Sequence, residues 1–146
     1  MGFFDTLKVM KNIVTGGIEA YKVGEKLDEL IEKVEDDYED ALTTNDKARL
    51  KQYRKAKKAY DKNTDADNND EMLENMENSR LAFLEALKDN STLPKSLKTE
   101  IKTSIAEFKK ADNKALDSLG EMLENYAEND EQRAEVRKTL DESKRK

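Results

Sequence analysis

The sequence predicts an all-α protein, a bundle of five to six helices stacked as antiparallel hairpins. Three observations lead to this fold class. The 146 residues are 41% charged and 36% hydrophobic, with only five glycines and one proline, which is typical of long helices with solvent-exposed faces. The apolar residues recur at steps of three and four, as on one face of a helix, and strand-like alternation is missing. The sign of the charge also reverses from one expected helix to the next.

The first expected element is residues 1–17, a segment rich in large apolar side chains that ends in Gly16-Gly17. On a helix, five of its apolar side chains and that of Ile18, the residue that follows, fall within an arc about 120° wide. These side chains are Phe3, Phe4, Leu7, Met10, Val14 and Ile18. Lys8 and Lys11 follow the edge of this arc, a pattern that also suits a membrane interface. Two adjacent glycines weaken a helix, so we expect a hinge there. Packing on the protein's own core, contact with a partner and contact with a membrane all remain open.

The next elements follow from apolar spacing and capping chemistry. An apolar stripe from Tyr21 to Leu42 predicts the second helix. Residues 43–45, Thr-Thr-Asn, offer N-cap oxygens for a helix near 46–61. Residues 61–70 are dense in Asp and Asn, which favour turns, and are expected to form a loop.

The next two helices are bounded by a cap and a proline. Asn69 or Asp70 is expected to cap a helix that ends near Lys88. Pro94 suits the first turn of the following helix, because a proline there removes no helical hydrogen bond. That helix is expected to run from about 95 to about 127, with apolar residues on one face throughout.

A last helix is expected after Asn129, with Gln132 three residues later in a capping arrangement. We therefore divide the chain into an amphipathic segment, 1–17, a helical bundle, 18–142, and a basic, frayed tail, 143–146.

Charge is arranged in blocks of opposite sign. Residues 28–40 carry eight acids and one lysine, whereas residues 43–63 carry eight lysines and arginines and two acids. Opposite charges favour packing of neighbouring helices, so we expect 28–40 to lie beside 46–61. The basic residues and tyrosines of 48–60 resemble a nucleic-acid-binding surface. Because the acidic helix should neutralise them and the chain has a net charge of −6, we expect no nucleic-acid partner.

Catalysis and cofactor binding are not expected. The chain has no cysteine and no histidine, which removes thiol chemistry, the commonest acid–base catalyst and the usual zinc sites. Residues 63–74 have some of the oxygen ligands of a calcium loop. However, Asn68 stands where that loop requires glycine, and Asp70 where an apolar residue is usual. We therefore expect no metal site in this loop.

These observations predict a non-catalytic, small helical interaction or adaptor protein of bacterial or phage type. We expect it to bind a protein partner. We expect it in the cytoplasm, because no apolar run is long enough to span a bilayer. The apolar arc of residues 3–18 is the first candidate contact surface. The second is the acidic stretch 115–131, with Glu121, Glu124 and Glu128. A peripheral membrane protein anchored by the N-terminal helix is the alternative, and assembly into a homo-oligomer is a further possibility.

Overall fold

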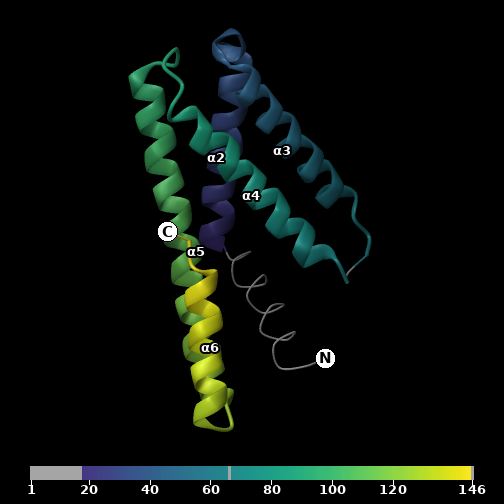
Figure 1. Cartoon of the computed structure of the whole chain (residues 1–146), viewed down its shortest axis with the longest axis vertical. Coiled ribbons are helices and arrows are strands. Elements are labelled where there is room, and N and C mark those ends of the chain that lie inside the picture. The colour runs from purple at the N-terminus through teal and green to yellow at the C-terminus, as the bar shows by residue number, and fades with distance from the viewer. Residues whose placement is uncertain (1–17, 66, 146) are drawn as a thin grey trace. The chain divides into compact units, whose positions relative to one another are not determined.

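The computed structural model describes residues 18–65 and 67–145, and in this part of the chain helices joined by short connections are the regular secondary structure, without strands (Figure 1). Its elements are α2 (Ile18–Tyr38), the short 3₁₀ helix η1 (Glu39–Ala41), α3 (Thr44–Lys62), α4 (Asn69–Leu87), α5 (Lys95–Tyr126) and α6 (Asp130–Ser143). The predicted all-α bundle is confirmed. The predictions made for residues 1–17, including the hinge at Gly16-Gly17, lie outside the described residues.

Two of the predicted helix starts are confirmed. Thr43 is the N-cap of α3: its hydroxyl accepts from the Asp46 backbone N–H at 3.0 Å, and the Asp46 carboxylate accepts from the Thr43 N–H at 3.1 Å. These two bonds form a capping box. At α6, the Asn129 side chain accepts from the Gln132 N–H at 2.9 Å. Both caps are local, which explains why the sequence alone could place them.

The predicted cap of α4 is wrong by one or two residues. The helix already includes Asn69, and the N-cap position belongs to Asn68, whose side chain makes no capping hydrogen bond. The oxygen of the Asn69 side chain accepts instead from the Asn63 amide at 3.3 Å. This side chain therefore stabilises the loop before α4 and does not cap the helix.

The chain divides into two compact units. In the unit Glu25–Ala106, α3 and α4 pack side by side and run in opposite directions (Figure 1). Apolar side chains from four helices fill its core. Fully or almost fully buried among them are Leu27, Ile31, Val34, Tyr53, Phe83, Leu84, Leu87, Leu97 and Ile101. With the exception of Tyr53, they belong to the stripes that the spacing predicts.

The acidic end of α2 lies beside basic α3, as the charge pattern predicts. The hydroxyl of Tyr53, which is fully buried, donates a hydrogen bond to Asp28 of α2, and Arg54 forms an ion pair with Glu35. From α4, Arg80 approaches the same Asp28 at 3.6 Å. Asp28 thus connects three helices of this unit.

Tyr53 is expected to make the stability of the protein depend on alkaline pH. Burial, followed by the hydrogen bond and charge of Asp28, raises the pKa of its hydroxyl above the ordinary value of 10.0. The folded protein therefore keeps a proton that the unfolded chain releases above about pH 10. The stabilisation is complete below that pH and is lost as the pH rises through the folded pKa.

Substitution of Tyr53 by Phe should remove this dependence. At pH 8, Tyr53→Phe should be less stable by roughly 1–2 kcal/mol, because the hydrogen bond to Asp28 is lost. Urea unfolding between pH 8 and pH 11.5 should show the gap between the two proteins narrowing above pH 10. A gap that stays constant would contradict a raised Tyr53 pKa, since the other titrating groups are common to both proteins.

The second unit contains Glu107–Lys146 together with the start of α2 up to Gly24. Here the end of α5 and α6 form a hairpin (Figure 1). Its core consists of Leu116, Leu119, Leu123, Val136 and Leu140. A Cβ atom on Gly120 would lie 2.7 Å from the Leu140 side chain. The glycine therefore permits a close approach of α6 to α5.

Lys144 and Arg145, the described residues after α6, make specific contacts, although the sequence predicts a frayed end there. The main chain of Arg145 exchanges two hydrogen bonds with the Asn113 side chain, each 2.7 Å long. Lys144 Nζ lies 2.5 Å from Asp117, and Arg145 Nε donates to Asp112 at 2.7 Å. The physical reason is that Asp112 is buried within the hairpin and needs a positive partner.

A candidate protein-binding surface on α5

The structure describes only some of the predicted contact residues. Phe3, Phe4, Leu7, Met10 and Val14 lie outside the described residues. Ile18 begins α2, but its side chain also lies outside the description. Only the acidic stretch at the end of α5 can be followed in the structure.

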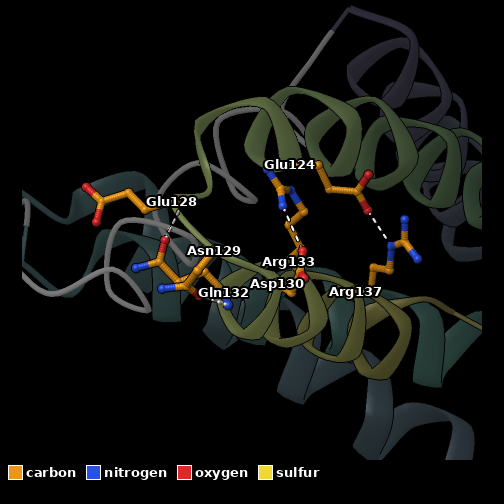
Figure 2. Close-up of polar contacts among 7 residues, drawn as sticks. All are labelled: Glu124, Glu128, Asn129, Asp130, Gln132, Arg133 and Arg137. Atoms are coloured by element: carbon orange, nitrogen blue, oxygen red, sulfur yellow. Dashed lines mark hydrogen bonds and ion pairs between the residues drawn. The ribbon is translucent and has the colours of Figure 1, made fainter.

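Within that stretch, Glu124 faces α6. Its carboxylate accepts from Arg137 Nε at 2.6 Å, and Figure 2 shows the two side chains pointing toward each other across the hairpin. The hydrogen bond from Arg137 lowers the pKa of Glu124, and the same contact raises the pKa of Arg137. The carboxylate of Glu124 is therefore occupied within the hairpin and is a poor candidate for contact with a partner.

Glu121 and Glu128 remain exposed to solvent. At Glu128 only the backbone N–H is held, by the Gln132 side chain at 2.8 Å, while the Glu128 carboxylate points away from α6 (Figure 2). Neighbouring Asp130 pairs with Arg133 at 3.0 Å. The turn between α5 and α6 thus has defined hydrogen bonds and presents Glu128 outward, while Glu121 is exposed on α5 itself.

The sequence did not identify the exposed apolar residues of this region. Met122 is 40% exposed and Tyr126 is 75% exposed, and these are the two large apolar side chains exposed in the described part of the chain. Four residues apart on α5, they lie on the same face. The apolar spacing of residues 95–127 predicts Tyr126 as part of the core stripe, and this prediction is wrong because the side chain is exposed. Tyr126 is the last residue of α5, and no described element covers its ring.

Met122 and Tyr126 continue a longer strip of small and apolar residues. At 3.6 residues per turn, five residues of α5 fall within an arc of about 80°. This α5 strip consists of Ala111, Ala115, Ser118, Met122 and Tyr126. It is about 22 Å long at the helical rise of 1.5 Å per residue.

A cleft lies at the N-terminal end of the α5 strip. Its volume is about 350 Å³. It is lined by Lys22, Val23, Glu107, Lys110, Ala111 and Lys114. The strip thus has a lysine-rimmed cleft at one end and two exposed acids, Glu121 and Glu128, near the other. A surface of this kind can bind an apolar helix face and also set its direction.

A cluster of metal-binding acids and a membrane-spanning helix are both absent from the part of the chain that the structure describes. No three Asp or Glu side chains of residues 18–65 and 67–145 converge closely enough to hold a metal ion. In the loop that resembles a calcium site, the Asn63 side chain binds the backbone of Asp65, and the Asp65 side chain accepts from the Asp67 N–H. None of the helices in those residues has an apolar stretch long enough to cross a bilayer.

Comparison with known proteins adds no identification. The chain matches no protein-family model, no curated protein and no solved structure. The function of the chain is therefore inferred from the surface of α5 itself.

Proposed function

We propose that the protein is a non-catalytic interaction module that binds an amphipathic helix of a partner protein along the α5 strip. The observation that carries this proposal is the exposure of Met122 and Tyr126 side by side on α5, as the two large apolar side chains exposed in the described part of the chain. Burial of an exposed tyrosine contributes about 2–3 kcal/mol before the costs of association. Tyrosine is also among the residues that most often dominate protein interfaces.

The charges around the α5 strip define the partner further. Glu121 and Glu128 favour lysine or arginine on the partner helix at the Tyr126 end, and the lysines of the cleft favour acids at the other end. Exposed charges of this kind contribute more to orientation and association rate than to affinity. The partner is therefore a helix with an apolar face and a basic end.

A photo-crosslinker in place of Tyr126 tests this proposal. Crosslinking in cells that express the protein, with the same group in place of exposed Ala134 on α6 as the control, should trap one protein from position 126 alone. The trapped segment should be an amphipathic helix with lysine or arginine at one end. Crosslinks to a second copy of this chain, or identical products from both positions, would contradict the proposal.

Binding of a synthetic peptide of the trapped segment should then depend on the apolar pair. Met122→Ser with Tyr126→Ser should weaken binding at least 30-fold in calorimetry, because the anchor of the interface is lost. Both side chains are exposed, so the variant should remain folded. Glu121→Gln with Glu128→Gln should weaken binding only a few-fold and reduce its salt dependence. Glu131→Ser with Lys138→Ser, two exposed residues of α6, should leave the affinity unchanged.

The peripheral-membrane alternative depends on residues 3–18 and stays a prediction, as do the cytoplasmic location and the bacterial or phage origin. Flotation of the chain with liposomes, with and without residues 1–17, tests the membrane alternative directly.

A further inference from the structure

A row of lysines covers the outer face of α3. The lysine stripe consists of Lys47, Lys51, Lys55, Lys58 and Lys62, all of them exposed. At 3.6 residues per turn, they fall within an arc of about 80°. Tyr53 and Ala56, which α3 buries in its unit, lie on the opposite side of the helix.

The acidic helix does not neutralise this stripe. Arg54 is the cation of α3 that pairs with α2, through Glu35. Lys57 pairs within α3 with Asp61, and Asp46, the other acid of α3, is buried in its capping box. No side chain of the lysine stripe forms an ion pair or hydrogen bond with any residue that the structure describes. The expected cancellation of charge fails there, because a neighbouring helix can meet only one flank of α3.

We propose that the lysine stripe binds the phosphate backbone of a duplex nucleic acid. Along one flank of the stripe lie the exposed residues Ala48, Gln52 and Ala59, which offer no large apolar anchor. Against an acidic protein surface, each exposed ion pair would contribute only about 0–1 kcal/mol. A duplex instead carries one negative charge per roughly 1.7 Å of axis and releases condensed counterions when its phosphates are neutralised, so charge alone suffices for binding.

The surroundings of the lysine stripe favour a duplex over an anionic membrane or a single-stranded nucleic acid. The protein has a net charge of −6, and acidic 28–40 lies beside α3. An anionic membrane would face these acids as well as the lysines, whereas a duplex contacts little beyond one helix face. Single strands are held mainly by aromatic stacking, and the tyrosine nearest the centre of α3, Tyr53, is fully buried.

The geometry sets the expected salt dependence. The lysine stripe is about 22 Å long at 1.5 Å per residue, shorter than one turn of duplex. Neutralisation of about five phosphates gives a slope near −4.5 for log K against log salt concentration. Between 50 and 200 mM salt, affinity should fall about 500-fold. Binding should be insensitive to base sequence, because lysines on phosphates read no base edges.

Fluorescence anisotropy with a labelled 20-base-pair duplex tests the proposal on the full chain. The test variant is Lys51→Gln with Lys55→Gln and Lys58→Gln. The matched control is Lys95→Gln with Lys102→Gln and Lys138→Gln, three exposed lysines elsewhere that change the net charge equally. The test variant should lose at least tenfold in affinity at 50 mM salt, and its salt slope should be smaller by about 3. The control should change affinity less than threefold.

Three results would overturn the proposal. One is the absence of duplex binding at 50 mM salt. Another is an equal loss in the control variant, which would assign the effect to net charge. The third is lysine-dependent binding to vesicles of anionic phosphatidylserine without binding to the duplex, which would make a membrane the occupant of the stripe. Circular dichroism of both variants should match the unmodified chain, because every substituted side chain is exposed.

Discussion

Substitution of Arg145 by Ala is expected to lower the free energy of unfolding by about 3 kcal/mol. Arg145 Nε donates to Asp112 at 2.7 Å, and Asp112 is only 3% exposed. The other carboxylate oxygen of Asp112 has no hydrogen-bond partner among the described residues. Loss of the guanidinium would therefore leave a buried negative charge without compensation. The guanidinium also lies over the Phe108 ring, 5.5 Å from its centre, so packing is lost as well.

The neighbouring residue supplies a matched control for this prediction. Lys144 pairs with Asp117 at 2.5 Å, but both side chains are in contact with water, so Lys144→Ala should change stability little. The backbone bonds between Arg145 and Asn113 persist in either variant. Urea unfolding followed by circular dichroism measures both effects.

A second variant separates the charge pair from simple packing. Asp112→Asn combined with Arg145→Ala removes the uncompensated charge and should recover part of the loss seen in Arg145→Ala alone. Equal losses in the single and double variants, or in Arg145→Ala and Lys144→Ala, would show that the Asp112 contact does not hold the end of the chain.

The features that could be predicted from the sequence are those that depend on residues close together in the chain. The caps at Thr43 and Asn129 each join residues three apart, and helix periodicity identified most of the core. The pairing of 28–40 with α3 followed from blocks of opposite charge, which act through whole helices rather than through individual residues.

The candidate surface could be predicted only in part, because burial of a given residue depends on contacts between distant segments. Nothing in the sequence separates the three acids Glu121, Glu124 and Glu128. In the structure, Arg137 of α6 forms an ion pair with Glu124 alone. Tyr126 fits the periodicity of the core but ends its helix uncovered. Among many acids, nothing in the sequence distinguished buried Asp112, since its partner lies 33 residues further along the chain.

Substitution of Asn90 by Ala is expected to cost about 4 kcal/mol, because this one side chain satisfies several buried polar groups. Asn90 is 5% exposed. Its amide nitrogen donates to the Ala41 carbonyl and to the Asp46 carboxylate, both at 2.8 Å. Its oxygen accepts from the N–H groups of Thr92 and Leu93, at 2.8 and 3.2 Å. Figure 1 shows the two connections that it joins, before α3 and before α5, at the same end of their unit.

The loss should follow from polar groups rather than from volume, and Asn90→Asp tests this at nearly constant shape. That variant keeps the acceptor for Thr92 and Leu93 but places a carboxylate against Asp46, so at pH 7 it should be at least as unstable as Asn90→Ala. On acidification, a proton shared by the two carboxyl groups restores a donor, and the folded state then binds more protons than the unfolded state. The stability of Asn90→Asp relative to the unmodified chain should therefore rise as the pH falls toward 4.5. Urea unfolding at both pH values measures this, with Asn45→Ala, an exposed residue of α3, as the control. A constant difference in stability between Asn90→Asp and the unmodified chain would mean that Asn90 acts by filling space and that its hydrogen bond to Asp46 contributes little.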